Sequence, residues 1–235
     1  MQMQQIILTV GLASCLPLSA VPQSDRFTGD AIFPRASAAL VVGVGEADDS
    51  NGPTSFSLGE ALRAFEVVAE HTLVVDELTR ARLDSTACGL AGGVSVEPDE
   101  VYSFVSQLLY EHGFVVTQTR DSAPKLLGVR SADSSTGVKG ARSVAEEDLA
   151  AFERFPSLLI TTTLPVEHLD ARYTVNALRG LVPDPSRLRI LAVGGSLVAN
   201  GCAGDVANIV GMLRSIEAAE AARSDRAGED ATEAE

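Results

Sequence analysis

The segment VSVEPDEVYSFVSQLLYEHGFVVTQT, residues 94–119, carries the clearest succession of folding signals in the chain. Pro98 suits the first turn of a helix, where its missing N–H group costs no hydrogen bond. Gly113 can take the left-handed conformation that ends many helices, and an apolar, β-branched run follows it. Between them, apolar side chains recur at helical spacing at Val101, Phe104, Val105, Leu108 and Leu109. The segment therefore predicts a helix that leads directly into a strand.

The stretch before this segment predicts another helix and strand. Ser57 and Glu60 form a capping box, in which each side chain accepts a hydrogen bond from a free backbone N–H group at the helix start. Apolar residues then recur at helical spacing, and residues 72–75 are short and apolar, as in a buried strand. Residues 83–96 contain several glycines and predict an irregular strand-and-loop region.

A hairpin is predicted after the helix, with arms at residues 114–119 and 125–130 and a polar turn between them. Residues 54–131 therefore predict a compact α+β unit, a short mixed sheet with two helices packed on it.

Residues 155–218 predict a second small α+β domain. Residues 158–164 suit a strand, Asp170 caps a helix, and a tight Gly-Gly turn joins strands at 188–193 and 197–199. The last helix begins near Asp205. The order strand, helix, strand, strand, helix predicts a split sheet with both helices on one face.

The remaining stretches flank these two units. Residues 24–53 and 132–154 predict linkers that are rich in Ser, Gly and Asp. The first is expected to contain one short strand in its apolar patch, residues 38–44, and the second a short helix with a capping-box pattern at Ser143 and Glu146. Residues 219–235 are acidic and lack an apolar stripe, which predicts a helical turn or two and then a disordered tail.

The N-terminus, residues 1–23, is typical of a signal segment. Its apolar stretch has the length of a signal-peptide core and is too short to span a membrane. Leu12-Ala13-Ser14-Cys15 has the form of a lipobox, which makes Cys15 a candidate lipidation site, and ordinary cleavage near Ala20 is the alternative. The start lacks the usual Lys or Arg, so a cytoplasmic chain with an apolar first element also stays open.

The balance of acidic and basic residues argues against two classes of function. The 235 residues include 32 acidic and 18 basic ones, which gives a formal net charge of −14. This balance argues against nucleic-acid binding and against docking on anionic lipid, because both need clustered Lys and Arg.

No arrangement of residues predicts a catalytic, cofactor-binding or metal site. His71 and His112 are expected at helix C-terminal ends and His168 in a turn, and none has a ligand at metal-binding spacing. Cys88 and Cys202 are expected as two buried thiols, with a disulfide between them as the alternative.

One short motif has two interpretations. Gly201-Cys202-Ala203-Gly204 has the G-x-x-G form of the KH loop, which clamps a nucleic-acid backbone. Asp205 follows it and the loop has no Lys or Arg, so a strand-to-helix turn is favoured.

The first unit resembles the N-terminal periplasmic domain of bacterial secretins, the outer-membrane channel proteins of type II secretion and related systems. The similarity runs through residues 55–77 and 94–119. In that family a Pro-Asp-Glu helix leads into Leu-x-x-His-Gly-Phe and a hairpin, and residues 98–100 and 109–114 stand in those places.

The second unit resembles the small repeated secretin domain, which has a KH-like topology. LPVEHLDA, residues 164–171, and GSLVANG, residues 195–201, approximate its entry and its hairpin. The resemblance covers residues 54–218, and the barrel-forming secretin domain is not part of it.

The resemblance implies a non-catalytic, exported assembly module without cofactors. Such a module would form or dock on a periplasmic ring, with secretin channel subunits, other secretion-system components or further copies as partners. The expected location is the periplasm, with the outer membrane contacted only through a lipid on Cys15. The alternatives are a periplasmic binding or regulatory protein with the same folds and, more remotely, a KH-type nucleic-acid binder.

Overall fold

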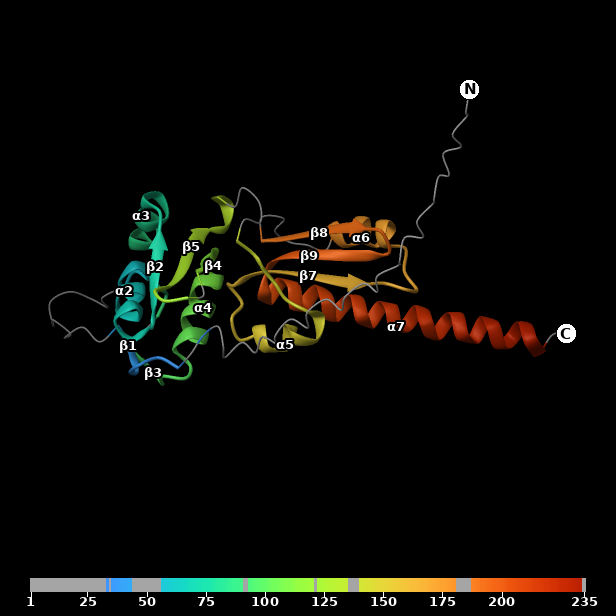
Figure 1. The fold of residues 1–235 in the computed structure, drawn as a ribbon, viewed down its shortest axis with the longest axis horizontal. Coiled ribbons are helices and arrows are strands. Elements are labelled where there is room, and N and C mark those ends of the chain that lie inside the picture. The colour runs from blue at the N-terminus through green and yellow to red at the C-terminus, as the bar shows by residue number, and fades with distance from the viewer. Residues whose placement is uncertain are drawn as a thin grey trace, which may run out of the picture.

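The computed structural model describes residues 33, 35–43, 56–90, 93–120, 122–134, 140–180 and 187–233. Within these ranges the chain forms several small sheets flanked by helices, which is the α+β class that the sequence predicts (Figure 1). The signal-like segment and Cys15 lie outside the described residues.

The first sheet has three strands in the order β2-β5-β4. Strand β5 (Lys125–Ser131) lies between β2 (His71–Val75), which is parallel to it, and β4 (Phe114–Arg120), which is antiparallel. The sheet is therefore mixed, and the predicted strand and hairpin are both confirmed.

Two helices of the first sheet begin and end where local signals place them. Helix α2 (Leu58–Val68) starts with the predicted capping box, with both the Ser57 and the Glu60 hydrogen bonds present. Helix α4 (Val101–Glu111) is capped by His112 and followed by Gly113, which has a φ of 73°. A side chain in that conformation is strained, so glycine fixes the point at which the helix gives way to β4.

A third helix, α3 (Glu77–Ser85), corrects the expectation of two helices on this sheet and of irregular structure from residue 83. Asp76 caps it by accepting a hydrogen bond from the Thr79 N–H group at 2.9 Å. Only Thr79 and Leu83 are buried along it, so it has too weak an apolar stripe to be recognised as amphipathic.

A two-stranded sheet lies against α2. It pairs β1 (Leu40–Val42) with β3 (Val94–Val96) in antiparallel register. Strand β1 belongs to the stretch that the sequence predicts as the first linker with one short strand, and it buries Leu40 and Val42.

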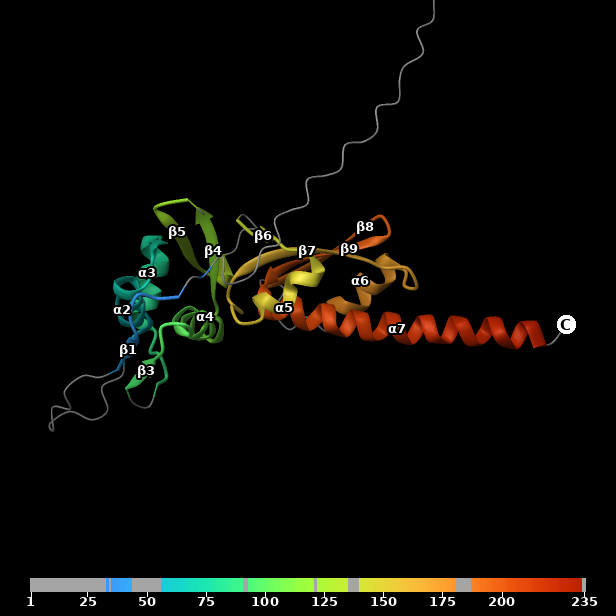
Figure 2. The same ribbon diagram turned by 60° about the horizontal axis from the view of Figure 1, so that its bottom comes forward.

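The second sheet has four strands in the order β6-β7-β9-β8. Its long strands are antiparallel, and β6 is parallel to β7. The predicted succession of strand, helix, strand, strand, helix is confirmed, and the helices lie under one face of the sheet (Figure 2). The elements are β6 (Arg142–Ser143), β7 (Leu159–Pro165), α6 (Ala171–Arg179), β8 (Leu188–Val193), β9 (Ser196–Cys202) and α7 (Ala203–Glu233).

The stretch predicted as the second linker is partly ordered against this sheet. After η1 (Ala132–Ser134), it forms β6, η2 (Glu146–Asp148) and α5 (Leu149–Phe152), and buries Leu149 and Phe152. The short helix is confirmed, but Ser143 does not cap it, because Ser143 lies in β6 and Ala145 precedes η2.

Helix α7 continues to Glu233, further than the predicted turn or two beyond residue 218 (Figures 1 and 2). Ala, Glu and Arg are strong helix formers, and Arg223 pairs with Glu220 one turn away. Beyond residue 218, helix α7 therefore depends on local helix propensity and not on an apolar stripe along the helix.

The buried apolar residues of the first and second sheets join in one continuous cluster. No helix in the part of the chain that the structure describes is both long and apolar enough to cross a membrane.

Candidate interaction surfaces

The two sheets meet at a contact that we call the seam, formed by α4 and β4 on one side and by the starts of β7 and α7 on the other. The Val116 N–H group donates to the Ser157 carbonyl at 2.8 Å, and the Ser106 and Ser157 hydroxyl oxygens are 2.8 Å apart. Both serines are buried. Backbone and side-chain hydrogen bonds thus cross the seam where water is excluded.

One face of α4 contributes three side chains to this side of the seam. Tyr102, Ser106 and Tyr110 follow one another at four-residue spacing, which aligns them along the helix. Tyr102 contacts Phe33 at a ring distance of 5.4 Å, and the Tyr110 hydroxyl donates to Asp205 Oδ1 at 2.6 Å. This row was not predicted, although its spacing is visible in the sequence.

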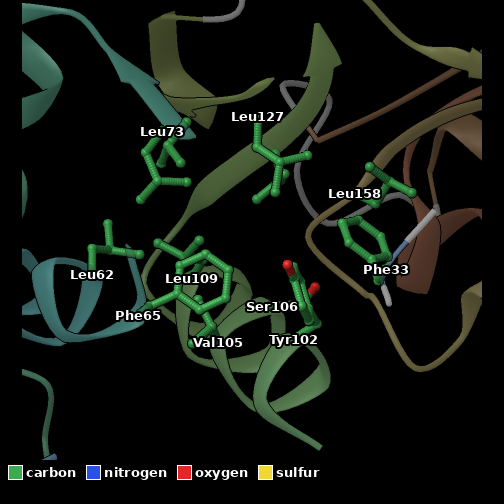
Figure 3. Close-up of a pocket in the computed structure, with 12 residues that line it drawn as sticks. Phe33, Leu62, Phe65, Leu73, Tyr102, Val105, Ser106, Leu109, Leu127 and Leu158 are labelled. Carbon is green, nitrogen blue, oxygen red and sulfur yellow. The ribbon is translucent and has the colours of Figure 1, made fainter. Parts of the chain in front are cut away.

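A small cavity lies beside the seam (Figure 3). Its volume is about 20 Å³, which is room for little more than one water molecule. Leucine, valine and aromatic side chains surround it, and Ser106 and Tyr102 add hydroxyl groups. The cavity is too small for a substrate or a cofactor.

Phe33 closes this region from the N-terminal side. Its ring lies 4.3 Å from that of Phe155 and 6.2 Å from that of His71.

Burial raises the pKa of Tyr102 to about 12, so its hydroxyl group stays protonated at neutral pH.

His71 differs from the sequence-based expectation. It is the first residue of β2 and is buried, with Nδ1 2.8 Å from the Tyr102 hydroxyl oxygen. His112 does end α4, and its Nε2 lies 3.3 Å from the Cys88 carbonyl oxygen. In the described ranges, no three His, Cys, Asp or Glu side chains gather in a way that could hold a metal ion.

The two cysteines within the described part of the chain are buried thiols, as the favoured interpretation has them. Cys88 is 4% exposed and Cys202 is 1% exposed. Burial raises the pKa of the Cys88 thiol, and the nearby Glu60 carboxylate raises it further. Cys202 packs with Val115 and Ala132 in a small apolar cluster at the seam.

The G-x-x-G motif forms the turn from β9 into α7, with Gly201, Cys202 and Ala203 buried and Gly204 half-buried. A Cβ at Gly201 would overlap the backbone of Arg187, and one at Gly204 would lie 3.0 Å from Pro156 Cβ. The glycines therefore allow close approach between backbones. Their burial and the adjacent Asp205 leave no exposed loop for a nucleic-acid backbone.

The face of the second sheet away from its helices exposes apolar side chains. Leu191 is 47% exposed and Val193 is 60% exposed, and they lie on the same face of β8 because alternate strand residues do. Among the described strands β8 pairs with β9 alone, so it is also an edge strand. An exposed, apolar edge strand is a surface on which other chains can pair.

The outer edge of the first sheet is different. The Leu73 N–H group on β2 donates to the Glu66 carboxylate at 3.1 Å, and α3 packs beside it through Leu83. The ion pair between Arg63 and Asp84, at 3.0 Å, joins α2 to α3. One backbone donor of this edge is therefore taken by a side chain of the same chain, while Val74 of β2 is 49% exposed.

No protein-family model and no curated protein matches the chain. Solved structures do resemble it. A chain of the Klebsiella pneumoniae type II secretion system outer membrane complex, with PulD, PulS and the PulC HR domain, is 16% identical, with a TM-score of 0.48. The match covers 69% of this chain and 26% of that one, so this chain spans about a quarter of its length.

Two further structures are similar at lower TM-scores. The N-terminal domain of the secretin XcpQ from Pseudomonas aeruginosa is 17% identical, with a TM-score of 0.24, and the match covers 70% of this chain and 62% of that one. The GspC–GspD complex of enterotoxigenic Escherichia coli gives 12% identity, a TM-score of 0.25 and coverage of 70% and 94%. The similar structures are N-terminal secretin domains, at low sequence identity.

Proposed function

We propose that the chain is a non-catalytic, exported assembly module that resembles the periplasmic part of a type II secretion secretin. It forms or docks on a periplasmic ring through protein–protein contacts. The observation that carries this proposal is the succession of two helix-backed mixed sheets in one chain, with the secretin-like motifs at their element boundaries.

The motif residues occupy structural positions that fit this function. The Pro-Asp-Glu motif, residues 98–100, immediately precedes α4, and the His-Gly-Phe motif, residues 112–114, joins α4 to β4. In the second unit Pro165 ends β7 and Asp170 caps α6 by accepting from the Tyr173 N–H group at 2.7 Å. We accordingly assign residues 54–131 and 155–218 as two domains, and the second as KH-like.

The surfaces favour protein contacts over chemistry. The cavity at the seam is too small for a substrate, and the G-x-x-G motif is covered. The exposed face of β8 presents Leu191 and Val193, which suits contact with another protein subunit.

The remaining parts of the proposal concern location. Residues 1–23 act as the export signal, with Cys15 as the lipidation site if the chain is anchored to the outer membrane. The partners are secretin channel subunits, other secretion-system components or further copies of this chain.

The test is co-purification of the full chain with the channel protein of its own organism after membrane solubilisation. Val193→Asp on the exposed β8 face is expected to reduce recovery at least about tenfold, since a charge on an apolar contact is costly. Val67→Asp, on α2 and 82% exposed, is the matched control and is expected to leave recovery unchanged.

A strictly monomeric chain that never co-purifies would contradict the proposal and favour a periplasmic binding or regulatory protein. Co-purification that both variants leave intact would keep the assembly role but move the contact away from β8.

A further inference from the structure

Three side chains form a compact polar cluster at one end of the seam. The Tyr110 hydroxyl donates to Asp205 Oδ1 at 2.6 Å, and Arg187 Nε lies 3.3 Å from Asp205 Oδ2. The Arg187 guanidinium also stacks on Tyr110, with 3.9 Å between its central carbon and the ring centroid. Tyr110 belongs to helix α4 of the first sheet. Arg187 immediately precedes β8, and Asp205 lies in the first turn of α7.

This cluster is largely withdrawn from water. The side chains of Arg187 and Asp205 are 23% and 20% exposed. Burial opposes the charge on Arg187, but the Asp205 carboxylate and Tyr110 raise its pKa above the usual value. Removal of one partner would leave the others partly buried with less compensation, which is more costly than the loss of an exposed contact.

The contacts along the seam change in character from one end of α4 to the other. At Tyr102 the contact is aromatic, through Phe33 and Phe155; at Ser106 it is the hydrogen bond to Ser157; at Tyr110 it is the polar cluster. Tyr102 and Tyr110 are eight residues apart, or about 12 Å along the helix. The apolar cluster near Tyr110 is small and separate from the main core.

We infer that Tyr110, Asp205 and Arg187 form a latch that holds the two sheets as one rigid body, and that its release opens the seam locally about the aromatic end. The Tyr110 end of the seam is held by few directional contacts and a small apolar cluster, and such a contact opens more readily than the continuous apolar core at the aromatic end. This conformational device does not depend on the proposed function.

Cys202 provides a reporter for the opening. It lies in the seam beside Arg187, whereas Cys88 lies in the first unit, where its N–H group donates to the Phe56 carbonyl. The two thiols are similarly buried, so opening of the seam exposes only Cys202, and global unfolding exposes both.

The experiment measures maleimide labelling rates of both thiols in the full chain with Cys15→Ser. In Tyr110→Phe, which keeps the ring over Arg187 and removes only the hydroxyl, Cys202 is expected to react about tenfold faster or more, with Cys88 unchanged. Tyr173→Phe, a 76% exposed tyrosine on α6, is the matched control and should change neither rate. Unchanged Cys202 labelling, or equal acceleration of both thiols, overturns the latch.

Hydrogen exchange gives a second measurement without thiol chemistry. The Val116 amide is bonded across the seam, whereas the Leu127 amide lies inside the first sheet. In both Tyr110→Phe and Asp205→Asn, Val116 should exchange faster while Leu127 keeps its parent rate. If the two amides accelerate together or neither changes, the latch is contradicted.

Discussion

The outer edges of the two sheets differ in what covers them. At β2, the edge of the first sheet, the Glu66 carboxylate occupies the Leu73 N–H group and α3 packs alongside. At β8, the edge of the second sheet, Leu191 and Val193 are about half exposed or more. At the first edge a side chain of the same chain takes the Leu73 N–H group, and Val74 is 49% exposed. The second edge exposes two apolar side chains on one face, the surface that suits another subunit.

In the second sheet, the segment that follows β6 is held by charge. The Arg214 guanidinium binds Glu146 of η2, with Nε and Nη2 each 2.5 Å from a carboxylate oxygen, and it also pairs with Glu217. This network holds the segment after β6 against α7. The buried Leu83 side chain thus holds α3, and ionised groups hold the segment after β6, which predicts different responses to mutation and to pH.

The largest effect is expected from Leu83→Ala, which removes the buried anchor of α3. Leu83 is 2% exposed, and truncation of a buried leucine costs about 2–4 kcal/mol. Leu191→Ala on the open β8 edge is the matched variant and should stay within about 0.5 kcal/mol of the parent. Urea unfolding of both variants checks this, and equal costs would show that the two edges are not different.

A smaller effect is expected from Glu217→Gln at neutral pH. Burial opposes ionisation of Glu217, but hydrogen bonds from the Glu167 backbone N–H group and from Arg214 lower its pKa below the ordinary 4.5. Loss of these charged hydrogen bonds should cost about 1.5–3 kcal/mol.

The pH dependence has a definite sign. Because the folded-state pKa is the lower one, the stabilisation by Glu217 is fully present above about pH 4.5 and is lost as the pH falls through the folded value. The parent should therefore lose more stability than Glu217→Gln between pH 5 and acid conditions, as urea unfolding would measure. Glu220→Gln, which breaks only an exposed pair with Arg223, is the control. Parallel pH profiles for the parent and Glu217→Gln would contradict the assignment.

The smallest effect on stability is expected from Glu66→Ala, at about 0.5–1 kcal/mol. Its clearer consequence is local, because the Leu73 amide loses its acceptor and should exchange faster with solvent. Glu66→Gln keeps a side-chain acceptor and should stay close to the parent. If exchange at Leu73 is the same in all three proteins, Glu66 does not close this edge.

Local signals predicted most of the regular elements. The capping box at Ser57, the cap at Asp170 and the stop at Gly113 are each complete within a few residues, so the sequence alone contains them. Helix α3 was not predicted because its packing depends on Leu83, and one buried leucine does not form an apolar stripe along a helix. Strand β6 was not predicted because it has only two residues, and these are a strand only through their pairing with β7.

The candidate surfaces were less predictable. The Leu191 and Val193 alternation is visible in the sequence, but the strand's place at an edge is set by the sheet order. The interpretation of the G-x-x-G motif as a turn is supported, yet the close approach of Gly204 to Pro156 follows only from the packing of α7 against the segment before β7.

The sequence by itself determined the α+β class, the order of the helices and strands that carry local signals, and the absence of the basic clusters that nucleic acids require, because each of these depends on residue type and short-range spacing. Only the tertiary structure decided the seam, the partner of Tyr110 and the difference between the two edges. Tyr110 and Asp205 are 95 positions apart, and no local pattern encodes a contact that forms only after both sheets have folded.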